Sequence, residues 1–247
     1  MVTRQRASLV ILALIVIFGS HRVAQAQPAC GHFTRAPVAA PAPRTAESAV
    51  RRFELINAEV KSVPHRVLFL GDSITERYDQ EVWQRDMAPR GVLNAGVSGD
   101  RTENLLWRLE HGDLAGPTPK GLIVMIGTND LTSGGHPRPP ELVAEGIRAN
   151  LFYLRQRLPN TRILLLGLYP RADVPRLRPK IPEVNRLIED CDDGRWVVYA
   201  DIGGVLLEGD GQLSRAVSPD LLHFSRLGYE RLAPRLNPLI DNLLAGR

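Results

Sequence analysis

Five short apolar runs recur along the chain, separated by segments with helical spacing. The runs do not alternate with polar residues, which is typical of parallel strands that are buried on both faces. We therefore expect strands at residues 66–70, 92–95, 122–126, 163–168 and 197–202.

The segments between these runs have the 3.6-residue period of amphipathic helices. The two clearest apolar faces are formed by Val143, Ile147, Leu151, Leu154 and Leu158, and by Tyr229, Leu232, Leu236, Leu239 and Leu243. Strands that alternate with helices predict an α/β domain, a three-layer α/β/α sandwich with right-handed crossovers. For its five-stranded parallel sheet we expect the flavodoxin-like order 2-1-3-4-5.

The start of the chain has a different pattern. Arg4 and Arg6 precede an apolar run over residues 7–19, and Ala24-Gln25-Ala26 follows. This predicts a secretory signal peptide over residues 1–26, cleaved before Gln27. The alternative is an uncleaved anchor, but about 13 apolar residues are fewer than the roughly 20 that cross a bilayer as a helix. We expect an exported protein, periplasmic or secreted, without stable membrane insertion after cleavage.

Residues 27–44 are rich in Pro and Ala and have no hydrophobic period, which predicts a flexible lead-in. A single domain then covers residues 45–247, which is long enough for one full core. The chain has two cysteines, Cys30 and Cys191. In an oxidising compartment they form either one disulfide or two unpaired thiols, and the sequence leaves both possibilities open.

The charge of the chain argues against a nucleic-acid partner. There are 31 Lys and Arg against 27 Asp and Glu, but three of the arginines and no acid lie in residues 1–26. The rest is nearly neutral, and no predicted helix carries a basic stripe. The one basic run, residues 171–180, is interpreted as a solvated loop.

Polar motifs follow the ends of three predicted strands. They are Gly71-Asp72-Ser73, the segment from Asn94 to Thr102, and Gly127-Thr128-Asn129-Asp130. A fourth motif, Asp220-Leu221-Leu222-His223, lies in the long loop before the last helix. Because binding crevices of open α/β sheets lie along the carboxyl ends of the strands, we expect the motifs to meet there.

Together these motifs contain the groups that ester hydrolysis needs. Ser73 can attack a carbonyl, His223 can take its proton, and Asp220 can orient the imidazole. The backbone N–H groups of Ser73 and Gly99 and the side-chain amide of Asn129 can form an oxyanion hole. This chemistry requires no cofactor and no metal.

Each motif alone also has an ordinary structural explanation. Ser73 could cap the helix that follows it, and Gly, Asn and Asp are common turn residues. We expect Gly96 to serve turn geometry and Asp130 to brace its loop. Ile74, Leu222 and His136 are the candidates for the substrate pocket, because the first two adjoin the nucleophile and the base.

The serine comes first and the acid and base lie together near the end, an order that differs from the standard α/β-hydrolase order. It resembles the SGNH or GDSL hydrolase superfamily over residues 67–229. Within that superfamily, the chain looks most similar to the platelet-activating-factor acetylhydrolase-like group. Three segments carry this similarity: Gly99-Asp100-Arg101-Thr102, Leu106-Trp107-Arg108-Leu109 and residues 166–171. The resemblance implies a flavodoxin-like fold, catalytic Ser73, Asp220 and His223, and an oxyanion hole with Gly99 and Asn129.

We therefore expect an exported serine carboxylic ester hydrolase that removes acetyl-type groups from glycans or small lipids through an acyl-enzyme on Ser73. A lysophospholipase or thioesterase of the same superfamily is an alternative. Two rivals come from other classes: a non-catalytic ligand-binding module, and a metal-dependent phosphoesterase using Asp72, Asp130 and Asp220. The expected partner is a small acyl ester, and the sequence does not indicate an oligomeric state.

Overall fold

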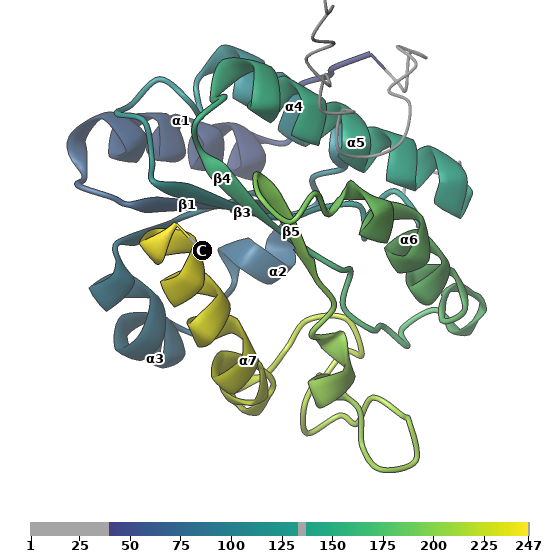
Figure 1. Ribbon diagram of the computed structural model, residues 1–247. Helices are drawn as coiled ribbons and strands as arrows, with labels where there is room; N and C mark the ends of the chain where they lie inside the picture. The colour runs from purple at the N-terminus through teal and green to yellow at the C-terminus, as the bar shows by residue number, and fades with distance from the viewer. Residues whose placement is uncertain (1–39, 133–136, 247) are drawn as a thin grey trace, which may run out of the picture.

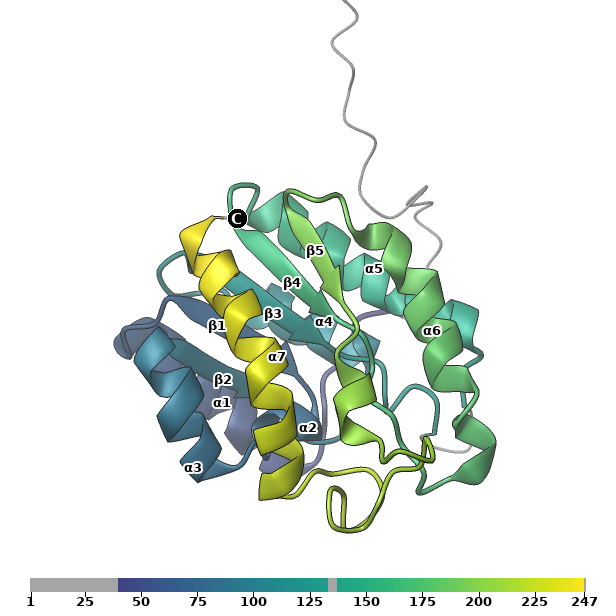
Figure 2. The same cartoon turned by 60° about the horizontal axis from the view of Figure 1, so that its bottom comes forward.

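The computed structural model describes residues 40–132 and 137–246. Within them, a five-stranded parallel sheet lies between two layers of helices (Figures 1 and 2). The strand order is β2-β1-β3-β4-β5, which confirms the predicted order. The strands are β1 (Val67–Gly71), β2 (Val92–Gly96), β3 (Gly121–Met125), β4 (Arg162–Leu166) and β5 (Val197–Ala200).

Both faces of the sheet are apolar, and each packs into its own hydrophobic core. Leu68 and Leu70 of β1 belong to one core, whereas Val67 and Phe69 belong to the other. Successive strand residues point to opposite faces, so two apolar faces require an unbroken apolar run. This explains the pattern from which the strands were predicted.

Helices α1, α4, α5 and α6 cover one face of the sheet, and α3 and α7 cover the other (Figure 2). The long helices are α1 (Glu47–Ser62), α4 (Thr102–His111), α5 (Pro140–Arg157), α6 (Lys180–Ile188) and α7 (Arg226–Ala245). The shorter elements are α2 (Ser73–Glu76), α3 (Gln80–Val82), the π-helical turn η1 (Trp83–Met87), and the 3₁₀ turns η2 (Ala88–Arg90), η4 (Pro175–Leu177), η5 (Glu189–Cys191) and η6 (Gly203–Leu206).

The two predicted apolar helix faces point into these cores. Val143, Ile147, Leu151 and Leu154 of α5 are buried in the first, and Tyr229, Leu232, Leu236 and Leu243 of α7 are buried in the second. Leu158 and Leu239, at the edges of the two faces, are partly buried against the same cores.

The last residues before α1 are attached to the domain. The N–H of Ala42 donates to the carbonyl oxygen of Glu103 (3.3 Å), and Nδ2 of Asn104 donates to the carbonyl oxygen of Ala42 (2.8 Å). The guanidinium of Arg44 donates to the carbonyl oxygen of Gly99. These bonds bring residues 42–44 against the first turn of α4 and the loop that follows β2.

The predicted signal peptide and most of the lead-in lie outside the described residues and stay predictions. Cys191 is buried. In the described part of the chain no cysteine is free, and Cys191 is disulfide-bonded. Cys30 lies outside the described residues. Among residues 40–132 and 137–246, no helix combines the length and the apolar character needed to cross a membrane.

Candidate active site

Ser73 is the first residue of the short helix α2, directly after β1. The side chain of Asp72 caps this helix by accepting a hydrogen bond from the N–H of Ile74 (2.9 Å). The start of a helix has backbone N–H groups without intrahelical acceptors, and these favour negative charge. Ser73 thus lies at a helix start, where free backbone N–H groups favour negative charge.

Two glycines, Gly96 at the end of β2 and Gly99 in the loop that follows, have different roles. A Cβ on Gly96 would lie 2.3 Å from the backbone nitrogen of Glu76, so Gly96 allows the close approach of α2. This corrects the expectation that Gly96 serves turn geometry. Gly99 is the residue with a left-handed backbone, at φ 79°, a conformation that glycine adopts without steric cost.

Ser73, His223 and Asp220 are connected by hydrogen bonds. Nε2 of His223 lies 2.9 Å from Oγ of Ser73, and Nδ1 of His223 lies 2.7 Å from Oδ2 of Asp220. Oδ1 of Asp220 accepts from the backbone N–H groups of Leu222 (2.9 Å) and His223 (2.7 Å). When Nδ1 carries the proton and donates to Asp220, Nε2 is the acceptor for the proton of Ser73.

The hydrogen bonds that Asp220 accepts also set its charge. Partial burial alone would raise the pKa of this carboxyl, but the bonds from the imidazole of His223 and from the two backbone N–H groups lower it to about 2. Asp220 is therefore ionised at neutral pH. An ionised carboxylate here favours the positively charged imidazole that forms when His223 takes a proton.

The turn between the acid and the base has an unusual backbone conformation. Leu221 has φ 63° and is the only non-glycine residue with positive φ in the described part of the chain. Its carbonyl oxygen accepts from the N–H groups of Ala172 (2.8 Å) and Asp173 (3.3 Å). Such strain persists only where the surroundings hold it, so the loop after β4 helps to define the Asp220–His223 turn.

The three expected oxyanion donors lie on the loops after β1, β2 and β3, which are neighbours in the sheet. Within residues 40–132 and 137–246, the backbone N–H groups of Ser73 and Gly99 donate to no protein atom. Nδ2 of Asn129 donates to the carbonyl oxygen of Asp100 (2.9 Å) and lies 3.5 Å from Oδ2 of Asp72. The bond to Asp100 fixes the plane of the amide beside the Gly99 loop.

A buried ion pair, which the sequence does not reveal as part of the site, supports that loop. Arg108 of α4 is 2% exposed, and its Nε donates to Oδ2 of Asp100 (2.7 Å). The same guanidinium pairs with Asp113 and donates to the carbonyl oxygen of Ala95 (3.1 Å). Burial raises the pKa of Asp100 to about 6, against the opposing effect of Arg108. The only sequence signal is a charged residue on the buried face of a helix.

Asp130 braces the loop after β3. Its carboxylate accepts from the N–H (3.0 Å) and Oγ1 (2.7 Å) of Thr102 and from Nη1 of Arg138 (2.7 Å). The three carboxylates of the phosphoesterase alternative thus bond to different partners: Asp72 to α2, Asp130 to α4 and Asp220 to His223. Among the described residues, no group of three or more His, Cys, Asp or Glu could hold a metal ion.

The substrate-pocket candidates have different positions. Ile74 is 3% exposed and belongs to the core beneath α7, where the hydroxyl of Tyr229 donates to its carbonyl oxygen (2.8 Å). This burial corrects the expectation that Ile74 flanks the acyl group. Leu222 is half-buried beside His223. His136 lies outside the described residues.

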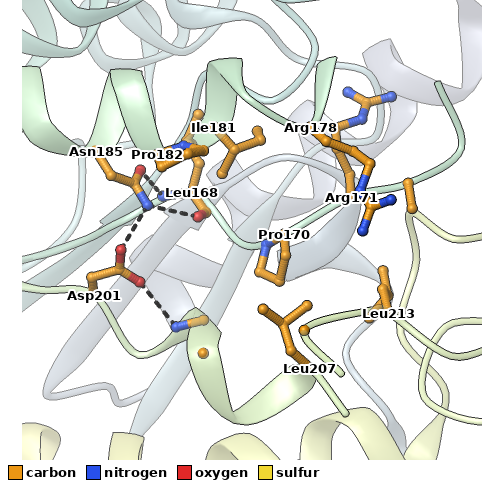
Figure 3. Close-up of a pocket in the computed structure, with 14 residues that line it drawn as sticks. Leu168, Pro170, Arg171, Arg178, Ile181, Pro182, Asn185, Asp201, Leu207 and Leu213 are labelled. Atoms are coloured by element: carbon orange, nitrogen blue, oxygen red, sulfur yellow. Dashed lines mark hydrogen bonds between the residues drawn. The ribbon is translucent and has the colours of Figure 1, made fainter. Parts of the chain in front are cut away.

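A cavity of about 290 Å³ opens at the carboxyl ends of β4 and β5 (Figure 3). Asn185 and Asp201, which are hydrogen-bonded to each other (2.9 Å), form its polar side. Arg171 and Ala172 also line the cavity, and Ala172 contacts the Asp220–His223 turn as described above. Neither Ser73 nor His223 lines this cavity.

The fold and these motifs define a hydrolase of the GDSL class. Residues 69–231 match the model of the GDSL-like lipase/acylhydrolase family, and the chain belongs to this family. The chain is also 36% identical over 191 residues to platelet-activating factor acetylhydrolase IB subunit alpha1 of Homo sapiens, covering 76% of this chain and 80% of that protein. The resemblance inferred from the motifs is thereby confirmed.

Solved structures show the same fold at low sequence identity. A GDSL-like lipase from Bacteroides thetaiotaomicron superposes with a TM-score of 0.61 at 19% identity, covering 79% of this chain and 98% of that chain. An acetylxylan esterase from Geobacillus stearothermophilus has a TM-score of 0.55 at 20% identity, covering 74% of this chain and 96% of that chain.

Proposed function

We propose that this protein is an exported serine esterase that hydrolyses short-chain, acetyl-type carboxylic esters of glycans or small lipids. The observation that carries the proposal is the 2.9 Å hydrogen bond between Oγ of Ser73 and Nε2 of His223, with Asp220 on the other ring nitrogen. A nucleophile, a base and an orienting carboxylate in this relation are the recurring arrangement of serine hydrolases.

In the first half of the reaction, Oγ of Ser73 attacks the carbonyl carbon while its proton moves to Nε2 of His223. Negative charge develops on the former carbonyl oxygen, which accepts hydrogen bonds from the N–H groups of Ser73 and Gly99 and from the amide of Asn129. The imidazolium then gives its proton to the leaving alkoxide as the carbon–oxygen bond breaks. The acyl group remains as an ester on Ser73.

In the second half, water attacks the acyl carbon and gives a proton to Nε2 of His223. The second tetrahedral intermediate collapses, the bond to Oγ of Ser73 breaks, and the proton returns from the imidazole to the serine oxygen. The products are the carboxylic acid and the free enzyme. Asp220 stays ionised throughout, because its pKa of about 2 lies far below neutral pH.

The assignment to short acyl groups is supported by two similar proteins, both of which are named for the removal of acetyl groups. One is a platelet-activating factor acetylhydrolase subunit and the other an acetylxylan esterase. The export assignment is supported by Arg4 and Arg6, the apolar run over residues 7–19, and Ala24-Gln25-Ala26. For an exported enzyme, acetylated glycans and small lipids are accessible esters.

A panel of 4-nitrophenyl esters from acetyl to decanoyl, run beside acetylated xylo-oligosaccharides, tests the substrate class. We expect the highest kcat/KM for acetyl or propionyl esters, labelling by a fluorophosphonate, and full activity in EDTA. A preference for octanoyl would favour the lysophospholipase or thioesterase alternative. Loss of activity in EDTA, restored by a divalent cation, would favour the phosphoesterase, and no turnover with any ester would favour the ligand-binding module.

A further inference from the structure

Arg171, in the loop after β4, is a buried arginine that the sequence pattern does not distinguish from its neighbours. The basic run over residues 171–180 suggests a solvated loop, but Arg171 is only 4% exposed. Its Nη1 donates to the carbonyl oxygen of Thr128 (2.9 Å), and its Nε and Nη2 donate to the two carboxylate oxygens of Asp173 (2.8 and 2.6 Å). Arg178 lines the same cavity (Figure 3). It is exposed, and its guanidinium hydrogen-bonds to Gln212.

The bonds of Arg171 lead to both halves of the proposed site. Thr128 directly precedes Asn129, the expected side-chain donor of the oxyanion hole. On the other side, the N–H groups of Ala172 and Asp173 donate to the carbonyl oxygen of Leu221, the strained residue within the Asp220–His223 turn. One guanidinium and the two residues after it therefore connect the loop after β3 to the turn that carries the base.

We propose that Arg171 is a positioning residue that holds the Asn129 loop and the Asp220–His223 turn in the relative placement that the reaction needs. This inference rests on the proposed esterase function. A planar guanidinium that bonds a carboxylate with two parallel hydrogen bonds fixes orientation as well as distance. Misplacement of catalytic groups by about 1 Å can lower a rate by about 10²-fold. The two-bond pair of Arg171 with Asp173, called the fork below, can therefore affect turnover without contacting the substrate.

Its burial and bonding separate Arg171 from a substrate-binding arginine. All three nitrogens of its guanidinium donate to protein atoms, at distances of 2.6 to 2.9 Å. Loss of the fork should therefore lower kcat and leave KM nearly unchanged. A lysine has one point-like ammonium and no fork, so Arg171→Lys should restore only part of the rate lost in Arg171→Met.

The experiment compares Arg171→Met and Arg171→Lys with Arg178→Met as the matched control, in the full chain with 4-nitrophenyl acetate. We expect kcat to fall about 10- to 100-fold in Arg171→Met, with KM changed by less than about threefold. Arg178→Met should stay within about twofold of wild type. Asp173→Asn weakens the fork without removing Arg171, so it provides a milder variant if Arg171→Met does not fold.

A second readout does not depend on turnover. The proton between Nδ1 of His223 and Asp220 gives a downfield NMR resonance when the turn is ordered. We expect it to broaden or vanish in Arg171→Met and Asp173→Asn and to persist in Arg178→Met. Folded variants with an unchanged kcat and an unchanged resonance would overturn the inference, as would a rise in KM alone.

The two proposals can fail separately. If Ser73→Ala retains the activity of wild type, the proposed function is wrong, and the resonance of His223 still tests whether Arg171 orders the turn. If Ser73→Ala is inactive while the Arg171 and Asp173 variants keep both kcat and the resonance, only the role of Arg171 is wrong.

Discussion

The Oγ atom of Ser73 lies 2.9 Å from Nε2 of His223, although 150 positions separate the two residues in the chain. Ser73 is held by the start of α2 after β1, and His223 by a turn that the loop after β4 supports. A contact between segments so far apart depends on the complete fold, which places both at the carboxyl edge of the sheet.

The Ser73→Ala variant should lose at least about 10⁴-fold in kcat/KM, because the nucleophile is absent while the rest of the site remains. Labelling by a fluorophosphonate should disappear as well. The matched control is Ser62→Ala, at the exposed end of α1, which should keep wild-type activity. If Ser73→Ala retained more than about a tenth of the activity, Ser73 would not be the nucleophile.

Activity should be low at acid pH, since only neutral imidazole can accept the proton of Ser73. Asp220, with a pKa of about 2, should add no further step above about pH 3. A pH–rate profile of kcat/KM measures this. Asp220→Asn should lower kcat by about 10³-fold or more, because an amide cannot stabilise the imidazolium. An activity maximum near about pH 4 would instead indicate a carboxylate base.

Asp72 should make the free energy of unfolding depend on pH. Burial raises its pKa from 3.8 to about 7, although the bond from Ile74 opposes the rise. As pH increases, the unfolded chain therefore releases this proton before the folded one does. Stability from the protonated carboxyl is complete below about pH 4 and is lost as pH rises toward about 7.

Urea unfolding of wild type and Asp72→Asn at about pH 4.5 and about pH 7.5 tests this sign. The stability of Asp72→Asn relative to wild type should increase with pH, by up to a few kcal/mol, because the amide does not titrate. Asp210→Asn, at an exposed turn, should follow wild type at both values. A difference between Asp72→Asn and wild type that does not change with pH would contradict the raised pKa of Asp72.

The sheet and the polar motifs could be predicted from the sequence because their signals are local. Burial on both faces forces unbroken apolar runs, such as Leu122 to Met125, and the binding edge of a parallel sheet follows from its topology. The separation of Asp220 and His223 by three positions also limits their geometry. Apolar strand runs and a short spacing between two residues can be recognised without knowledge of tertiary contacts.

The positions of Ile74 and Arg171 could not be predicted, because they depend on partners far away in the sequence. Tyr229 of α7, 155 positions after Ile74, bonds its carbonyl oxygen and covers it. Arg171 is buried by the loop that contains Thr128, 43 positions earlier. In the sequence alone, Arg171 and Arg178 look equally solvated, and only tertiary packing separates them.

The acyl-chain preference should now depend on Leu222, because Ile74 is buried in the core and Leu222 remains half-buried beside the base. One methylene is worth only about 1 to 3 kcal/mol in an apolar pocket, so butyryl esters should still react. Octanoyl esters should react about 10²-fold or more slowly than acetyl esters, since steric clashes accumulate with chain length. Leu222→Ala should shift the preference toward longer chains. It should also cause a modest loss of acetyl turnover, because the N–H of residue 222 donates to Asp220 and the smaller side chain leaves this turn less constrained.

The control for this shift is Leu227→Ala, which removes a leucine of α7 that is 40% exposed and should not change the preference. The measurement is the ratio of kcat/KM for 4-nitrophenyl octanoate and acetate in wild type and both variants. An unchanged ratio in Leu222→Ala would mean that other residues limit the acyl chain. If the wild type has a higher kcat/KM for octanoate than for acetate, the short-acyl assignment is wrong, because the space beside His223 then accepts a long chain without any substitution.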